Sequence, residues 1–300
     1  DSFAVYPGLN LYPGEVDQII DYTCRIARGL GAVGLINIQY VIHSGHIYVI
    51  EVNPRASRTV PFLSKATGVP MIRLATGAML GRPLKQQLTE LGYDDIDLDL
   101  SPLWPRQPLV AVKAPVFSMA KLRGVEVHLG PEMKSTGEAL GIDREFAPAF
   151  HKALLGAGMA LPERGRVLIS LADQDKPDAE AAIQILAKHG YHLYATEGTA
   201  RMIERAGMPV HLVTKRIGTG SPDMLDVILD GTVDAVVNTP GPAQQELLDG
   251  FTIRRAAVEK GIPCITSVDT LAAIAETIDR AQSYAVQPLG DYRKRVQVAY

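Results

Sequence analysis

The first third of the chain changes from a helical to a strand-like pattern of apolar residues. Within residues 14–30 the apolar side chains recur at every third or fourth position, which predicts an amphipathic helix. Residues 35–42 and 46–53 instead alternate between apolar and polar side chains on either side of Ser44 and Gly45. Two alternating segments joined by a short turn that contains glycine predict a β-hairpin.

The middle of the chain has shorter and weaker patterns. Residues 58–80 have helical spacing with one break at a glycine and a proline, and residues 82–108 are polar with several prolines, as in a surface connection or lid. Residues 109–118 and 132–141 are candidate strands, and residues 146–156 are a candidate short helix. These elements do not alternate strictly, which is typical of an α+β arrangement.

After residue 165 strands and helices follow one another regularly. The strands are expected at residues 166–171, 191–195, 210–213, 235–238 and 263–266, and the helices at residues 177–189, 199–206, from 221–223 onward, 242–259 and 269–284. Strict alternation predicts an open parallel sheet with helices on its faces. The fold class is therefore α/β, and we divide the chain into residues 1–158 and residues 159–300.

The predicted hairpin gathers polar residues of its two strands if its turn is centred on Gly45. Gln39 then faces Glu51, and Asn37 faces Asn53. Because residues two apart on a strand share a face, these polar side chains form one cluster. A two-residue turn would instead set the polar side chains of one strand against the apolar side chains of the other. In the first register the face toward the core carries Ile38, Tyr40, Ile50 and Val52.

A carboxylate with amide oxygens on neighbouring strands forms a hard-oxygen site. Such oxygens suit Mg²⁺, which keeps waters and phosphate oxygens in its other coordination positions. Arg55 and Arg58 follow the cluster directly and could bind a phosphate or carboxylate through paired donors. The same residues also fit a simpler interpretation, in which a half-buried hairpin exposes its polar side and two ordinary surface arginines.

Composition and charge exclude several classes of protein. Thirty basic and thirty-three acidic residues give a net charge of -3, which argues against a dedicated nucleic-acid binder or a polybasic membrane module. Cys24 and Cys264 lie far apart in the sequence and are expected to be reduced, as in a cytoplasmic protein. The sequence has neither an apolar run of membrane-spanning length nor a signal-peptide pattern.

Three segments carry a resemblance to a known enzyme family. Residues 34–40 and 48–68, which include the sequence Glu-Val-Asn-Pro-Arg, resemble an ATP-grasp ligase, and in particular the second synthetase half of the carbamoyl phosphate synthetase large subunit. Residues 129–138 are similar to the same family. The resemblance extends along the whole chain and implies the end of an ATP-grasp domain followed by a methylglyoxal-synthase-like domain.

The resemblance implies a role for each residue of the hairpin cluster. Gln39, Glu51 and Asn53 would bind Mg²⁺ or Mn²⁺, and Gln39 and Glu51 would also contact ATP. Arg55 and Arg58 would be catalytic and would stabilise the transferred phosphoryl group. The implied reaction is the phosphorylation of carbamate by ATP, which gives carbamoyl phosphate for pyrimidine and arginine biosynthesis.

The resemblance also places the adenine pocket and the glycine-rich phosphate loop before Asp1. We therefore expect this 300-residue chain to be a fragment that has no synthetase activity alone. The implied partners are a glutaminase small subunit and a second copy, bound through the regulatory domain. Asp1 and Glu138 occupy positions where some family members bind ornithine, although a cut terminus and a charge at a strand end explain them equally well.

Polar residues of the second domain fall where its strands end. Ligands of open α/β sheets bind beyond the carboxyl ends of the strands, and a helix amino terminus there favours anions. Singly, these residues could be ordinary helix caps and solvated lysines, but together they suit a phosphate-bearing ligand. The candidate residues are Ser170, Lys176, Thr196, Thr199, Lys215 and Asn238.

By its resemblance to the regulatory domain of carbamoyl phosphate synthetases, this rim would bind a nucleotide effector such as UMP or IMP. Methylglyoxal synthases carry a catalytic aspartate after the fourth strand, whereas residues 239–244 contain none, so lyase activity is not expected. A different class of function remains open, namely a stand-alone nucleotide-sensing module without catalysis. Neither the effector nor the direction of its effect follows from the sequence.

Overall fold

The computed structural model describes residues 1–93, 108–117, 132–215, 222–241, 244–280 and 284–294. The chain forms two compact units. The hairpin unit consists of Val5–Leu109 and Pro288–Tyr300, and the sheet unit consists of Asp1–Ala4 and Val110–Gln287. Several predictions lie partly outside the described residues. They are the connection over 82–108, the end of the strand over 109–118, the start of the 129–138 motif, the helix beginning at Ser221, the start of the helix over 242–259 and the end of the helix over 269–284.

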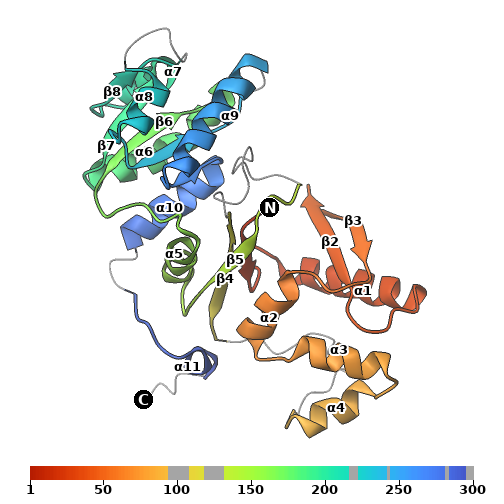
Figure 1. Cartoon of the computed structure of the whole chain (residues 1–300). Coiled ribbons are helices and arrows are strands. Elements are labelled where there is room, and N and C mark those ends of the chain that lie inside the picture. Colours follow the sequence, from red (N-terminus) through yellow and green to blue (C-terminus); the bar gives the residue numbers. More distant parts are fainter. Residues whose placement is uncertain (94–107, 118–131, 216–221, 242–243, 281–283, 295–300) are drawn as a thin grey trace. The chain divides into compact units, whose positions relative to one another are not determined.

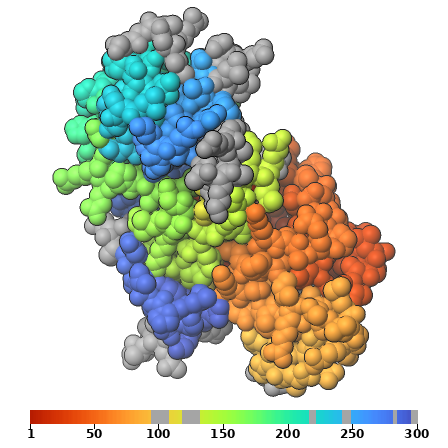
Figure 2. All heavy atoms as spheres, in the orientation of Figure 1, coloured from red at the N-terminus to blue at the C-terminus, as the bar shows by residue number. Residues whose placement is uncertain are grey.

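The hairpin unit combines a two-stranded sheet with short helices (Figure 1). Its elements are α1 (Pro13–Gly29), β2 (Asn37–His43), β3 (His46–Asn53), α2 (Thr59–Thr67), α3 (Met71–Met79), α4 (Leu84–Glu90) and α11 (Leu289–Arg293). The expected helix and hairpin are confirmed, and α4 occupies part of the segment that we expected to be a surface connection. Figure 2 shows side chains filling the space around α2, α3 and α4.

The hairpin register is confirmed at its open end but is wrong at its turn. Asn37 pairs with Asn53 and Gln39 with Glu51, whereas His43 pairs with His46, so the turn has two residues. Both turn residues have positive φ angles, which is the geometry that two-residue hairpin turns favour. A shift of register after Gln39 reconciles the two ends.

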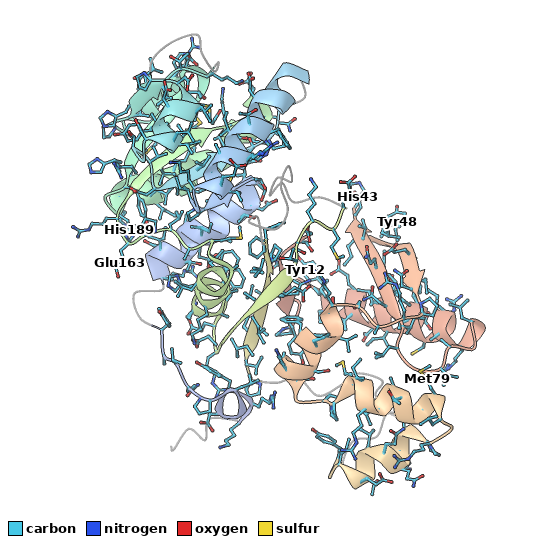
Figure 3. The ribbon with its side chains drawn as sticks, in the orientation of Figure 1. Tyr12, His43, Tyr48, Met79, Glu163 and His189 are labelled. Atoms are coloured by element: carbon cyan, nitrogen blue, oxygen red, sulfur yellow. The ribbon has the colours of Figure 1, made fainter. Side chains whose placement is uncertain are left out.

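The register shift corrects one part of the core prediction. Ile50 is the residue of β3 that is left without a partner in the pairing, and 59% of it is exposed instead of facing the core. At the other end of the hairpin, His43 and Tyr48 project from β2 and β3 (Figure 3). A bulge inserts one residue, so the strand can satisfy a tight turn and still present Glu51 and Asn53 on the polar face.

The sheet unit contains an antiparallel pair and a parallel sheet. Its elements are β4 (Val110–Val116), β5 (Gly137–Asp143), α5 (Phe146–Ala157), β6 (Arg166–Ser170), a 3₁₀ turn (Asp173–Asp175), α6 (Lys176–Lys188), β7 (His192–Thr196), α7 (Glu197–Arg205), β8 (His211–Val213), α8 (Met224–Leu229), β9 (Ala235–Asn238), α9 (Gln244–Glu259), β10 (Cys264–Ile265) and α10 (Val268–Arg280). The short strand β1 (Ala4–Tyr6) joins β4 and β5 in a three-stranded sheet.

The parallel sheet confirms the predicted fold class. Five strands are ordered β10-β9-β6-β7-β8, and all their pairings are parallel. Helix α6 packs with α10, and α8 packs with α9. The central strand β6 is almost wholly buried, because helices cover both of its faces. The compact units divide the chain elsewhere than at residue 158, and our domain boundary, which follows the family resemblance, stays a prediction.

The amino ends of β6 and β9 are joined by an ion pair that makes stability depend on pH. The Asp234 carboxylate accepts hydrogen bonds from the Arg166 backbone N–H at 2.8 Å, from Nε at 3.0 Å and from Nη2 at 2.8 Å. These bonds, mainly those of the guanidinium, hold the pKa of Asp234 below the usual 3.8. A depressed carboxyl pKa stabilises the fold above the unfolded-state pKa, and this contribution is lost as the pH falls through the folded-state pKa.

Replacing Asp234 by asparagine is therefore expected to flatten the dependence of the melting temperature on pH below about pH 4. At pH 7 the loss should be on the order of 1 kcal/mol, because water screens a partly exposed pair. Melting curves between pH 3 and pH 7 measure both effects. Asp17→Asn, on an exposed face of α1, is the control. Parallel pH profiles for the wild type and Asp234→Asn would contradict the prediction.

Candidate functional site

The polar cluster of the hairpin lies at the open end of β2 and β3. Gln39 is directly opposite Glu51, and Asn37 is directly opposite Asn53. The Asn53 Nδ2 donates a hydrogen bond to the Glu51 Oε1 at 2.8 Å. Glu51 and Gln39 are exposed, and the two asparagines are half-buried. The structure thus brings together the side chains that the sequence grouped, with one carboxylate among amides.

The two candidate arginines lie between the end of β3 and the start of α2, and the chain turns tightly at the first of them. The Arg55 backbone N–H donates to the Asn53 carbonyl oxygen at 2.8 Å, which reverses the chain directly after the cluster. The Arg55 Nη1 donates to the neighbouring Ala56 carbonyl oxygen at 3.2 Å, and Arg58 immediately precedes α2. Both arginines are exposed. They place positive charge at the protein surface directly after β3 in the chain.

The donor chemistry of this cluster fits a magnesium ion only in part. Among the described residues, no group of three or more acidic, histidine or cysteine side chains is placed to hold a metal. One carboxylate with amide oxygens provides hard ligands, but it leaves most of an octahedral shell to water and phosphate oxygens. The cluster alone thus provides too few ligands to complete such a shell, and Gln39, Glu51 and Asn53 stay predicted metal ligands.

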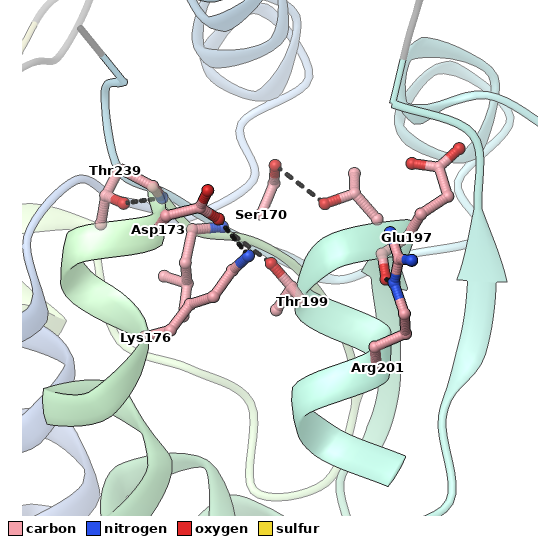
Figure 4. A network of polar contacts seen from close by, with 10 residues as sticks. Ser170, Asp173, Lys176, Glu197, Thr199, Arg201 and Thr239 are labelled. Carbon is pink, nitrogen blue, oxygen red and sulfur yellow. Dashed lines mark hydrogen bonds and ion pairs between the residues drawn. The ribbon is translucent and has the colours of Figure 1, made fainter. Parts of the chain in front are cut away.

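The second group of candidates meets at the carboxyl ends of the parallel strands. Ser170 ends β6, Thr196 ends β7 and Asn238 ends β9, and all three are at most 5% exposed. The Thr196 hydroxyl donates to the Ser170 hydroxyl at 3.2 Å, and the Thr199 hydroxyl accepts from the Leu171 N–H at 3.1 Å (Figure 4). These contacts join strands that are distant in the sequence into one buried polar rim.

Thr196 also lies at the start of α7, which begins at Glu197, two residues earlier than expected. Its hydroxyl makes no capping bond to the helix within the described part of the chain, because it is directed to Ser170. The first backbone N–H groups of α7 are thus available to an anion, as helix amino termini often are. Our alternative interpretation, in which this threonine caps the helix with its side chain, is therefore wrong for Thr196.

Lys176 lies beside this helix start. A Cβ atom added to Gly198 would be 2.8 Å from the Lys176 Nζ, so the ammonium group lies against the first turn of α7. Lys176 pairs with Asp173, and its hydrogen bond holds the pKa of that carboxyl below the usual 3.8 (Figure 4). Because the Asp173 side chain is 93% exposed, an anionic ligand could replace it without displacing buried groups.

A pocket opens on the same rim and contains the remaining candidates. It is lined by Ser170, Leu171, Ala172, Lys215, Met224, Asn238, Thr239, Gly241, Asp249, Gly250 and Ile253. The Thr239 hydroxyl accepts from the Ala172 N–H at 2.9 Å and so fixes the loop after β6. The three lining residues from α9 were missed by the sequence argument, although helical spacing from the apolar Ile253 and Ala257 could have indicated which face of α9 is buried.

The residues considered for ornithine have partners within the sheet unit. The Asp1 carboxylate accepts hydrogen bonds from the backbone N–H groups of Lys134 and Ser135, and from the Ser135 hydroxyl. Glu138 forms an ion pair with Lys113 at 3.1 Å. An ornithine site at these positions stays a prediction. In the part of the chain that the structure describes, no helix is long and apolar enough to cross a membrane.

Comparison with known proteins finds two family models that match separate parts of the chain. Residues 1–87 match the family model of the carbamoyl-phosphate synthase L chain, ATP binding domain, and residues 178–266 match the MGS-like domain. The hairpin cluster lies in the first match and the polar rim largely in the second. The ATP-binding and MGS-like assignments of the two halves are thereby confirmed.

Named relatives extend the similarity to nearly the whole chain. The carbamoyl phosphate synthase large chain of Thermomicrobium roseum is 56% identical over 299 residues, which cover 99% of this chain and 27% of the relative. Those of Thermoanaerobacter sp. and Caldanaerobacter subterraneus are 46% and 43% identical over 93% and 98% of this chain, and over 24% and 26% of their own length. The chain spans about a quarter of these relatives. It belongs to the carbamoyl phosphate synthase large-chain family.

Proposed function

We propose that the hairpin unit provides one side of a site at which ATP phosphorylates carbamate to carbamoyl phosphate. The observation that carries the proposal is the Gln39–Glu51–Asn53 cluster, whose side chains meet on one face and are followed at once by Arg55 and Arg58. This cluster lies within the segment that matches an ATP-binding domain. The proposed cofactors are ATP and Mg²⁺ or Mn²⁺.

Each part of the cluster has a distinct task in this proposal. Glu51 supplies the negative charge, and the amide oxygens of Gln39 and Asn53 complete the protein side of a metal site. A bound Mg²⁺ would neutralise charge on the phosphates and orient them. Arg55 and Arg58 donate hydrogen bonds to the phosphoryl oxygens, whose charge is redistributed during transfer. Catalysis then rests on positioning and charge neutralisation, without a covalent intermediate on the protein.

We also propose that the chain acts only as part of a larger assembly. The large-chain relatives extend well beyond the matched segment, and the hairpin alone provides few metal ligands. The assembly would contain the rest of the ATP-binding domain and a glutaminase subunit as ammonia source. It would work in the cytoplasm and supply the pyrimidine and arginine pathways. The sheet unit would bind a nucleotide effector and could also associate with a second copy.

A chimera tests the catalytic proposal. Residues 1–300 replace the matching segment of the Thermomicrobium roseum large chain, and carbamoyl phosphate formation from ATP, bicarbonate and ammonia is measured. We expect activity from the chimera and none from the 300-residue chain alone. A folded but inactive chimera would contradict the catalytic proposal and favour a stand-alone nucleotide sensor. Bicarbonate-stimulated ATP turnover by the isolated chain would contradict the proposal that this chain provides only one side of the catalytic site.

Replacing Lys176 by glutamine tests the effector site. Loss of the ammonium group is expected to weaken binding of UMP or IMP to the 300-residue chain by about tenfold or more, because a charge-assisted hydrogen bond disappears. Isothermal titration calorimetry measures the affinity. The control is Lys188→Gln at the far end of α6, where the side chain is 75% exposed. Binding of neither nucleotide to the wild type at millimolar concentration would contradict the regulatory proposal.

A further inference from the structure

A buried arginine lies beneath the pocket of the sheet unit. Arg254, on α9, is only 2% exposed, and its Nη1 donates a hydrogen bond to the Oδ1 of Asn238 at 2.8 Å. Asn238 is 5% exposed and lines the pocket beside Lys215 and Ser170. A buried guanidinium has a large desolvation cost unless it is well hydrogen-bonded. Its bond to a pocket residue therefore suggests that Arg254 contributes to the pocket.

This contact decides which end of the Asn238 amide faces the ligand. A guanidinium can only donate hydrogen bonds, so the amide atom at 2.8 Å must be the oxygen. The Nδ2 group is consequently turned away from Arg254, and it has no hydrogen-bond partner among the described residues. Arg254 therefore makes Asn238 a donor toward the pocket. A donor beside a lysine favours a ligand group that carries negative charge or lone pairs.

A glycine makes the close approach possible. Gly250 precedes Arg254 by one helical turn, and a Cβ atom added to it would lie 2.7 Å from the Arg254 Nη1 and 3.3 Å from the Asn238 Oδ1. Any side chain at residue 250 would thus occupy the space in which the guanidinium meets the amide. The colliding atom is the end of a long side chain, so Arg254 would move away rather than the helix.

We propose that Arg254 is a positioning residue that fixes Asn238 as a hydrogen-bond donor and thereby makes this pocket selective for an anionic, phosphate-bearing ligand. The inference rests on the proposed effector site and adds the residue that sets its polarity. Arg254 acts through Asn238 and does not itself line the pocket. If Arg254 only filled the core, displacing its guanidinium would change the stability of the protein. The affinity of the pocket for its ligand would then stay the same.

Two variants separate positioning from packing. Gly250→Ala should displace the guanidinium and break its bond to Asn238, which lowers stability, and the preference of alanine for a helix offsets part of this loss. Asn238→Asp should keep the bond to Arg254 but present an acceptor to the pocket. Both are expected to raise the dissociation constant for UMP by about tenfold or more, measured at a temperature at which melting curves show each variant to be folded. Arg255→Met is the control, since Arg255 pairs with Glu259 on the exposed side of α9.

A spectroscopic measurement provides the readout that packing alone would not change. In the 300-residue chain labelled with ¹⁵N-asparagine, the side-chain amide signal of Asn238, identified by its loss in Asn238→Asp, should shift when UMP is added. In Gly250→Ala that shift should be largely lost. Equal UMP affinity and an equal amide shift in Gly250→Ala would overturn this inference while leaving the effector site intact. Failure of the wild type to bind UMP, IMP or inorganic phosphate would overturn both.

Discussion

Replacing Glu51 by glutamine is expected to reduce carbamoyl phosphate synthesis by the chimera about 100-fold or more. Glu51 is the one carboxylate of the Gln39–Glu51–Asn53 cluster, so the variant removes the charge that would hold the metal and its nucleotide. Glutamine has nearly the same size and can still accept the hydrogen bond that Asn53 donates at 2.8 Å. The hairpin should therefore keep its structure, and the loss should appear in turnover and in the Mg²⁺ requirement.

The matched control is Glu90→Gln on α4, which removes the same charge from the same unit. Glu90 pairs with Arg82 at the surface, where an ion pair contributes little, so this variant should retain nearly full activity. Steady-state rates at several Mg²⁺ concentrations, together with melting curves, distinguish a lost ligand from a lost fold. Full activity of the Glu51→Gln chimera would remove the basis of the catalytic proposal.

Replacing Gly141 by alanine is expected to destabilise the sheet unit by about 3 kcal/mol or more, at the upper end of overpacking effects. A Cβ atom at residue 141 would lie 1.9 Å from the carbonyl oxygen of Ala149 and 2.4 Å from the backbone nitrogen of Ala153. Both atoms belong to the backbone of α5, so no side chain can rotate away to relieve the clash. Helix α5 would have to separate from β5, which would open a packed interface.

Gly137→Ala on the same strand is the control for Gly141→Ala. The nearest atom to its added methyl group would be the Val116 Cβ at 3.9 Å, which is ordinary van der Waals contact. Denaturant and thermal unfolding of the two variants should therefore differ widely, although the chemical change is identical. Similar melting temperatures for both would show that α5 is less closely packed on β5 than the structure indicates.

The alternating pattern of the hairpin predicted some of its features correctly and one of them wrongly. Alternation of polar and apolar residues predicted both strands and the pairing of Gln39 with Glu51, because a side-chain period of two fixes which residues share a face. The same pattern led to the wrong turn, since a bulge at Ile50 changes the register within a continuous strand. Nothing in the alternation distinguishes an extra residue in the strand from an extra residue in the turn.

The sequence by itself determined the order of the elements, the parallel sheet of the second half and the identity of the candidate side chains. These follow from short-range periodicity and from residue chemistry, both of which are local. Only the tertiary structure decided that the Thr196 hydroxyl donates to Ser170 instead of capping its own helix. It also decided that Arg254 bonds to Asn238 and so orients the amide. Such contacts join residues on different strands and helices. Their geometry depends on sheet order and helix packing, which no single segment of the chain specifies.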